Sequence, residues 1–443
     1  MWRKEVRGIT IERLANGGEG IAHLPDGRVL FVEGAVPGDL VDVELSRDKK
    51  TWARGKVTGI QKKSPHRIPV ECEAFRRGCG GCQFWGVAPE QEFVWKTTAA
   101  FEAMVRISKV ELPTPQLEPS PTIRGYRSKI SFHQRRDAEG EVHLGFFATG
   151  SQEIVDVDRC LVARSEINEA LEEFGSILGL LGAGEFTLET AGDSSVVIQI
   201  ELGEKERISP GTLKELSRWL EQGQVVRGIE ILDARGKHFV LGDTTVAASE
   251  TMAYPPVKVM RQKAGLFRQA NQEVNRRLVD AVVEAAGGTE VGGSGPRILE
   301  LFSGSGNFSF PLLEIAESLV GVEGSAEAVE VARQVLTLRE DLESNAEFRV
   351  ADLFEPEMVS QVLEEEFDVL VLDPPRDGAA EVARQVVERG GSGLLLYVSC
   401  DPACLARDLK IYSEGGWEIR ELRFFDMFPR TSHLEMLAIL VRS

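Results

Sequence analysis

The sequence contains no run of about 18 uninterrupted apolar residues, which is the minimum for a helix that crosses a membrane. It also shows no apolar leader of the kind that directs secretion, because its first residues run straight into polar sequence. Cysteine is scarce, with six in 443 residues, which is too few for a disulfide framework in a chain of this length. These absences predict a cytoplasmic protein whose cysteines serve metal binding or catalysis.

The sequence also has no excess of basic over acidic residues. The net charge of -19 argues at first against a nucleic-acid partner. The charge is unevenly distributed, however, because residues 1–137 contain 23 Lys and Arg against 17 Asp and Glu, whereas the remainder contains 28 against 53. A mildly basic module on an acidic body can steer a polyanion to one face, although random scatter of surface charge is an equally good interpretation.

The length exceeds that of a single hydrophobic core and predicts two or three domains. Residues 1–60 form short strand patterns separated by glycine turns, typical of a five-stranded OB-like barrel in which Phe31 and Trp52 stack RNA bases or fill the core. Residues 61–265 alternate helical and strand signals and predict a central α+β domain. Its segment GYRSKISFHQRR interleaves basic and aromatic residues, which indicates either a nucleic-acid surface or the charged face of a strand.

Three cysteines, Cys72, Cys79 and Cys82, fall within eleven residues of a glycine-rich loop. Soft thiolates in this number select zinc or an iron-sulfur cluster, and Cys160 is a candidate for the fourth ligand. A zinc ribbon usually closes with a second close pair of cysteines, so this spacing favours a [4Fe-4S] cluster. Free structural cysteines are the remaining alternative.

From residue 266 onward the sequence alternates strands and helices and predicts a Rossmann-like α/β domain over 266–443. After the strand RILELF, the turn SGSGN lets the backbone approach a ligand at a helix N-terminus. The next two strands end in Glu323, placed to bind ribose hydroxyls, and in Asp352, placed to meet an adenine amino group. The incomplete GxGxxG pattern favours S-adenosylmethionine over a dinucleotide as the ligand. The alternative interpretation is that Glu323 and Asp352 are solvent-exposed carboxylates at strand ends.

The remaining motifs contain the candidate catalytic residues. FDVLVLD ends in Asp373, which can accept a hydrogen bond from a planar base, and LLLYVSC places Cys400 at the carboxyl end of a strand, where open α/β sheets bind ligands. A thiolate that adds to C6 of uracil makes C5 nucleophilic, and Glu435 at the start of the final strand can remove the C5 proton. Taken alone, Cys400 is better interpreted as a buried hydrophobe and Glu435 as an ordinary charge.

The order of motifs FRQANQEVN, LELFSGSGNFSFPL, GVEGSAEAVE, VADLFE, VLDPPRDGA, LYVSCDPACLARDL and HLEMLAIL resembles the RNA uracil-5-methyltransferase family. GGEGIAHLPDGRVLFVEGAVPGDLVDVEL resembles the TRAM domain, and the barrel with the cysteine cluster resembles the family's 23S rRNA branch. The resemblance implies a class I methyltransferase domain with Cys400 as nucleophile and Glu435 as base. The residues that it implies around S-adenosylmethionine and uracil are Gln269, Phe302, Asn307, Glu323, Asp352 and Asp373, and those that it implies around the [4Fe-4S] cluster are Cys72, Cys79, Cys82 and Cys160.

We therefore expect a cytoplasmic enzyme that methylates C5 of a uridine in RNA, with 23S rRNA as partner, no membrane and no obligate protein partner. The alternatives are a tRNA uracil-5-methyltransferase, an amino-methyltransferase, which needs no cysteine, and a non-enzymatic RNA-binding iron-sulfur protein. Two positions depart from the family pattern: the spacing from Cys72 to Cys79 is one residue longer, and Cys404 stands where threonine is usual.

Overall fold

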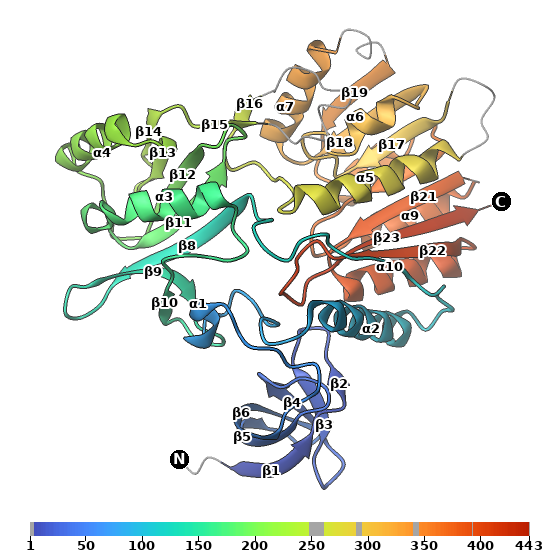
Figure 1. Cartoon of the computed structure of the whole chain (residues 1–443). Helices are drawn as coiled ribbons and strands as arrows, with labels where there is room; N and C mark the ends of the chain where they lie inside the picture. The colour runs from blue at the N-terminus through green and yellow to red at the C-terminus, as the bar shows by residue number, and fades with distance from the viewer. Residues whose placement is uncertain (1–3, 248–260, 289–294, 340–344, 392, 443) are drawn as a thin grey trace.

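The computed structural model describes residues 4–247, 261–288, 295–339, 345–391 and 393–442 (Figure 1). These residues form three larger β-sheets, which we call the N-terminal, central and C-terminal sheets, and one two-stranded ribbon. The N-terminal sheet lies at the bottom of Figure 1, the central sheet at the left and the C-terminal sheet at the right. Among the described residues, no helix is both long and apolar enough to span a bilayer.

The N-terminal sheet has the strand order β1-β5-β6-β4-β3-β2. Its strands are β1 (Glu5–Thr10), β2 (Arg13–Leu14), β3 (Gly20–His23), β4 (Val29–Glu33), β5 (Leu40–Asp48) and β6 (Trp52–Lys62). The sequence predicts five strands, the first of them over ITIERLA (residues 9–15). The structure has six, because this segment is divided between β1 and β2. The N–H of Ile11 bonds to Asp39 whereas that of Glu12 bonds to Ile21, so the chain changes its partner strand at this point.

The central sheet has the strand order β10-β9-β8-β11-β12-β13-β14. Its strands are β8 (Lys129–Arg136), β9 (Val142–Phe147), β10 (Ile154–Asp156), β11 (Gly184–Thr190), β12 (Val196–Leu202), β13 (Val226–Leu232) and β14 (His238–Gly242). Helices α3 (Ser165–Gly175) and α4 (Pro210–Gln222) pack on it, with a 3-10 turn at Leu178–Leu180. The ribbon of β15 (Thr245–Ala247) and β16 (Arg261–Lys263) leads toward the C-terminal sheet.

The C-terminal sheet has the strand order β19-β18-β17-β20-β21-β23-β22-β7. Its strands are β17 (Arg297–Leu301), β18 (Ser318–Glu323), β19 (Ala346–Val350), β20 (Val369–Leu372), β21 (Gly393–Ser399), β22 (Glu418–Phe425), β23 (Glu435–Arg442) and β7 (Gln116–Glu118). β17 to β21 are mutually parallel, and β23 is inserted antiparallel between β21 and β22. The strand order reverses at β17, and open α/β sheets bind ligands at the carboxyl ends of the strands beside such a point.

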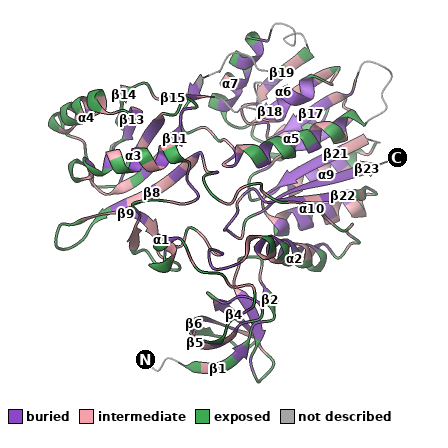
Figure 2. Cartoon of the chain, in the orientation of Figure 1, coloured by how far each residue is buried: buried purple, intermediate pink, exposed green. Residues whose placement is uncertain are grey.

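Helices cover both faces of the C-terminal sheet, whose strands are largely buried (Figure 2). One face carries α5 (Gln272–Gly287), α6 (Ser309–Leu313) and α7 (Ala326–Thr337). The other face carries α8 (Pro356–Val362), α9 (Ala380–Arg389) and α10 (Pro402–Glu414). This architecture agrees with the expected Rossmann-like α/β fold.

Two elements from the N-terminal half of the chain pack with the C-terminal sheet. After the short helix α1 (Glu73–Arg76), helix α2 (Pro89–Ser108) lies against α10 and buries Phe93, Ala100 and Met104 in the same core. β7 then pairs with β22 and forms the edge strand of the sheet. The expected division at 1–60, 61–265 and 266–443 remains a prediction, and these contacts place residues 89–118 physically with the third unit.

Candidate active site

A thiol and two carboxyl groups lie at one edge of the C-terminal sheet. Asp373 directly follows β20, and Cys400 directly follows β21. Because β23 runs antiparallel to β21, its first residue, Glu435, lies at the same edge. The register confirms this placement, since Ser399 before Cys400 pairs with Met436 after Glu435.

The local electrostatics raise the pKa of all three groups and so favour their protonated forms. Burial, together with the charges of Glu435 and Asp373, raises the pKa of the Cys400 thiol to about 11, while Arg376 opposes the rise. Burial also raises the pKa of Asp373 to about 7 and that of Glu435 well above its usual value. A cation that arrives at this edge would therefore favour the ionised forms of all three groups.

Arg376 is a residue of this edge that the sequence analysis did not assign to the site. It lies close enough to act electrostatically on both Cys400 and His433. Burial, and after it Arg376, lowers the pKa of His433, and Arg376 opposes the rise in the pKa of Cys400. The available signal was its position three residues after Asp373, in a segment that must turn back over the strand end. A fixed cation beside the thiol favours the thiolate, which is the nucleophilic form.

A buried polar cluster holds the segment that carries Arg376. Tyr397 Oη donates a hydrogen bond of 2.6 Å to Asp408 Oδ2, and the backbone N–H of Ala379 donates to the same oxygen at 2.8 Å. Asp408 is fully buried, so these bonds are not weakened by water. Gly378 has a φ of 72°, and an added Cβ there would lie 3.1 Å from that of Cys404, so this turn requires glycine. Cys404 therefore packs beneath the turn.

The glycine turn after β17 is tied to the end of β18. Glu323 Oε2 accepts a hydrogen bond from the backbone N–H of Gly304 at 3.0 Å, and its Oε1 accepts one from Ser325 at 2.8 Å. Gly304 has a φ of 56°, and no atom lies within 4 Å of the position that a Cβ would occupy. The backbone at this turn is consequently open to close approach by a ligand.

Phe354 contacts both Phe302 and Asp352. The rings of Phe302 and Phe354 lie 5.9 Å apart, and the N–H of Phe354 bonds to Asp352 Oδ1 at 2.9 Å. Phe354 is 52% exposed, which is unusual for so large an apolar side chain. Phe302 has a φ of 62°, a conformation that non-glycine residues hold mainly at functional sites. Sequence reasoning missed Phe354, whose only signal is its position two residues after Asp352.

Asn307 and Gln269 are placed differently from the strand-end residues. Asn307 forms a reciprocal amide pair with Asn275 on α5, with hydrogen bonds of 2.9 and 3.0 Å. Gln269 is buried in the segment between β16 and α5, and that segment ends at Asn271, the N-cap of α5. Asn307 therefore fixes the glycine turn to α5.

Two buried polar atoms beneath the glycine turn lack partners among the described residues: Glu300 Oε1 and Ser303 Oγ. The other oxygen of Glu300 accepts a hydrogen bond of 2.5 Å from Ser309 Oγ. Burial raises the pKa of Glu300 to about 8, and the nearby charges of Asp373 and Glu323 add to the rise. Buried polar atoms without partners indicate a place where a ligand or water completes the hydrogen bonding. The sequence analysis did not select Glu300, which reads there as an interruption of a buried strand.

The four candidate ligand cysteines, Cys72, Cys79, Cys82 and Cys160, line a single small cavity in the central region. Its other walls are mostly apolar and include Trp85, Phe75, Phe146, Ile130, Val157 and Leu161. All four thiols are free of disulfides. Burial raises the pKa of Cys79 to about 11 and that of Cys82 to about 12, with the neighbouring cysteines contributing. Arg127 and Arg159 also line the cavity, and Arg127 opposes the rise in the pKa of Cys82. Crowded buried thiols are costly to ionise unless cations compensate them.

Across the part of the chain that the structure describes, no group of three or more His, Cys, Asp or Glu side chains has an arrangement that could hold a metal ion. The expected iron-sulfur cluster is therefore not shown. The shared cavity and the donor set of four thiols nevertheless match a cluster better than a single ion, because each iron of a cluster needs only one thiolate.

The expected nucleic-acid surface at residues 124–136 is only partly exposed. Tyr126 and Phe132 are buried, and Tyr126 Oη donates a hydrogen bond to the carbonyl of Pro429. Arg127 lines the cysteine cavity. Tyr126 and Phe132 are therefore core residues that cannot stack bases, and the alternating pattern of β8 is what turns Phe132 inward.

A surface groove between the N-terminal sheet and α2 has the character of a base-binding surface. It is lined by Phe31, Trp52, Arg54 and Arg106, among others. The rings of Phe31 and Trp52 lie edge to face at 6.3 Å, and the Arg54 guanidinium lies 5.9 Å from the centre of the Phe31 ring. Half-buried aromatic rings beside arginines suit the stacking of single-stranded bases.

Comparison with known proteins shows which family the chain resembles. The family model described as tRNA (uracil-5-)-methyltransferase matches residues 98–443, and the TRAM domain model matches residues 3–58. Curated relatives named 23S rRNA (uracil(1939)-C(5))-methyltransferase RlmD cover nearly the whole chain. The protein from Methylococcus capsulatus is 32% identical, and that from Vibrio campbellii is 34% identical, each over 98% of this chain and 96% of the relative.

The fold is also found in a solved structure. The tRNA (uracil-54, C5)-methyltransferase of Pyrococcus abyssi, crystallised with S-adenosyl-L-homocysteine, matches with a TM-score of 0.71 and 24% identity over 98% of this chain and all of that one. The expected α/β fold class is thereby confirmed. The chain belongs to the tRNA (uracil-5-)-methyltransferase family and carries a TRAM domain at its N-terminal end.

Proposed function

We propose that this protein methylates C5 of a uridine in 23S rRNA, using S-adenosylmethionine as methyl donor. Membership of the family supports an RNA uracil-C5-methyltransferase, and the identity of 32–34% to full-length 23S rRNA enzymes supports the substrate. The observation that carries the proposal is the placement of Cys400 and Glu435 at the same edge of adjacent strands. An enzyme with this substrate and donor acts in the cytoplasm.

In the proposed mechanism, Cys400 begins the reaction. Its thiolate adds to C6 of the uracil, and the C5=C6 electron pair makes C5 a nucleophile that takes the methyl group from the sulfonium. Arg376 favours the thiolate that this step consumes. Glu435 then accepts the C5 proton, the C5=C6 double bond re-forms, and the C6–S bond breaks to return the thiolate to Cys400.

The methyl donor would occupy the carboxyl ends of β17, β18 and β20. The open backbone at Gly304, the exposed ring of Phe354 and the unpaired Ser303 Oγ together fit an adenosine with polar and aromatic surfaces. Glu323 and Asp352 would bind its ribose and adenine, and Phe302, Asn307 and Gln269 would shape the pocket. Asp373 lies between this region and Cys400, so it would contact the uracil and the donor's positive sulfur.

The four cysteines would hold a [4Fe-4S] cluster. Support comes from their convergence on one apolar cavity and from the absence of disulfides among them. The cluster would supply the positive charge that stabilises the buried thiolates. It lies in a different part of the chain from Cys400, so no step of the methyl transfer is assigned to it.

A comparison of two RNAs tests the substrate. We expect unmodified 23S rRNA to acquire 5-methyluridine at the position that corresponds to uridine 1939 of the relatives, whereas unmodified tRNA transcript acquires none. Labelled S-adenosylmethionine followed by nucleoside analysis measures both products. Methylation of tRNA alone would overturn the rRNA assignment, and a methylated amino group would overturn the C5 chemistry.

Trapping tests the nucleophile in the same assay. RNA that contains 5-fluorouridine at the target should form a covalent complex, because fluorine cannot leave as a proton. Cys400→Ala should form none and should lose at least a thousandfold in rate, whereas Cys404→Ala should behave like the wild type. A Cys400→Ala protein that methylates at the wild-type rate would disprove the mechanism.

A further inference from the structure

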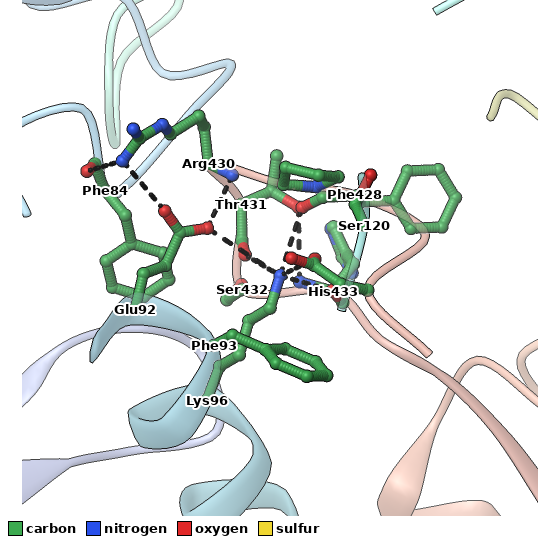
Figure 3. Close-up of polar contacts among 12 residues, drawn as sticks. Phe84, Glu92, Phe93, Lys96, Ser120, Phe428, Arg430, Thr431, Ser432 and His433 are labelled. Atoms are coloured by element: carbon green, nitrogen blue, oxygen red, sulfur yellow. Dashed lines mark hydrogen bonds and ion pairs between the residues drawn. The ribbon is translucent and has the colours of Figure 1, made fainter. Parts of the chain in front are cut away.

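The loop between β22 and β23, residues 426–434, leads directly into Glu435 and has no regular secondary structure to hold it. We call it the anchor loop. Its backbone carbonyls are partly buried and need partners, since a buried carbonyl without a hydrogen bond is costly. Figure 3 shows that its partners come from helix α2, which lies more than 300 positions earlier in the chain.

Lys96 on α2 supplies the first set of contacts. Its ammonium bonds to Asp426 Oδ1 at 2.5 Å and to the carbonyls of Phe428, Thr431 and His433 at 3.2 to 3.4 Å (Figure 3). An ammonium has three N–H groups, so these four acceptors use its full capacity. The Lys96 side chain is only 2% exposed. One buried cation therefore fixes the backbone of the anchor loop at three points.

Glu92, one turn earlier on α2, holds the loop through Arg430. Its Oε1 accepts a hydrogen bond of 2.5 Å from the backbone N–H of Arg430, and its Oε2 accepts one of 3.0 Å from the guanidinium. The guanidinium also donates to the carbonyls of Phe84 and Val87. Arg430 has a φ of 70°, a strained conformation for a non-glycine residue that persists only when its surroundings enforce it.

A cluster of buried ionisable groups is not the most stabilising way to fill a core. Four buried ionisable side chains, those of Glu92, Lys96, Asp426 and Arg430, form a chain of three ion pairs. Apolar side chains of similar volume often stabilise a fold equally well or better. Charged groups do, however, fix backbone positions that apolar contacts leave free. The last fixed carbonyl, that of His433, lies two residues before Glu435.

We propose that Lys96 and Glu92 are positioning residues that set the Glu435 carboxylate against the covalent intermediate on Cys400. The proposal rests on the proposed function above. Its step is the removal of the C5 proton by Glu435, with the C–H electron pair forming C5=C6 and the C6–S pair returning to Cys400. A base displaced by about 1 Å can lose on the order of a hundredfold in rate, whereas the thiol on the neighbouring strand keeps its place.

The test separates formation of the adduct from its resolution. We expect Glu92→Gln to form the trapped complex with 5-fluorouridine RNA within about twofold of the wild-type rate. On ordinary RNA the same variant should resolve its adduct at least tenfold more slowly, so that the covalent complex accumulates on denaturing gels. Glu90→Gln, an exposed position on the same helix, is the matched control and should resolve its adduct like the wild type.

A second variant guards against misfolding. Lys96→Met combined with Asp426→Asn removes the ion pairs that Lys96 forms with Asp426 and Glu92, leaves Glu92 paired with Arg430 and frees the three carbonyls. It should show the same accumulation while it binds S-adenosylmethionine normally. The proposal would be overturned if, in either variant, adduct formation and adduct resolution slowed equally. It would also be overturned if either variant resolved its adduct at the wild-type rate. Failure of the wild type to form any 5-fluorouridine complex would instead refute the proposed function.

Discussion

At the scale of single residues, the site holds more buried carboxyl groups than the chemistry consumes. Glu300 is the clearest case, because it is 1% exposed, has one oxygen without a described partner, and has a pKa raised to about 8 by burial. A carboxyl group with a raised pKa binds its proton more tightly in the folded state than in the unfolded state. Its contribution to stability is therefore complete below about pH 4.5 and is lost progressively as the pH rises toward 8.

We predict that Glu300→Gln gains stability relative to the wild type as the pH rises. The difference should be small at pH 5 and on the order of a few kcal/mol at pH 8, since each unit of pKa shift corresponds to about 1.4 kcal/mol. Urea unfolding at pH 5, 6.5 and 8 measures it. Exposed Glu388→Gln should change the unfolding free energy by less than about 0.5 kcal/mol at each pH. A pH-independent effect of Glu300→Gln would mean that the buried carboxyl group is ionised throughout.

At the scale of elements, the strand ends could be predicted from sequence and the contacts between elements could not. Asp373 and Cys400 follow parallel strands, whose carboxyl ends share one edge, so their convergence follows from local sequence and topology. Glu435 reaches the same edge because it begins β23, which runs antiparallel to β21. The segment GYRSKISFHQRR could not be assigned from the sequence, because a strand that alternates basic and apolar residues looks the same whether its apolar side faces RNA or a core, and in the structure Phe132 lies in the core. Only packing distinguishes the two.

Helix α10 begins directly after the nucleophile, because its N-cap residue, Asp401, follows Cys400 in the chain. Asp401 accepts hydrogen bonds from the N–H groups of Ala403 and Cys404 at 2.9 and 2.8 Å, and its charge helps to raise the pKa of Cys400. Asp401→Ala should destabilise the protein by about 1 kcal/mol, because it removes the cap, whereas Asp401→Asn should be nearly neutral.

Both Asp401 variants should make Cys400 react faster with iodoacetamide near pH 8, since each removes the negative charge beside the thiol. Peptide mass spectrometry follows the alkylation of Cys400, and urea unfolding follows stability. Equal loss of stability in the two variants would show that the charge of Asp401, and not its capping geometry, stabilises α10.

At the scale of the whole molecule, the cysteine cavity and the anchor loop are physically continuous. The N–H groups of Gln83 and Phe84, next to Cys82, both donate to the carbonyl of Arg430. No sequence pattern could reveal this link, because its two sides lie more than 340 positions apart and neither side has a periodic signal. For the same reason Lys96 reads in the sequence as a helix surface charge, although it is buried.

We predict that loss of the cluster loosens the anchor loop. Protein purified without oxygen should absorb broadly near ~400 nm, and Cys79→Ser should abolish this absorption. In hydrogen exchange the variant should lose protection in residues 72–87 and also in residues 426–434, whereas α7 should be unchanged. Zinc without iron in metal analysis would refute the cluster, and a loss of protection confined to residues 72–87 would refute the mechanical link.

The pairing of β7 with β22 has a consequence for synthesis of the chain. Gln116 pairs with Arg423, so about 300 residues must still be translated when β7 and the apolar side of α2 leave the ribosome. At synthesis rates of roughly 5–20 residues per second, that interval is about 15 to 60 s. During this time Phe93, Ala100 and Met104 have no core to enter. The nascent chain therefore exposes the apolar side of α2 long before its methyltransferase sheet can close.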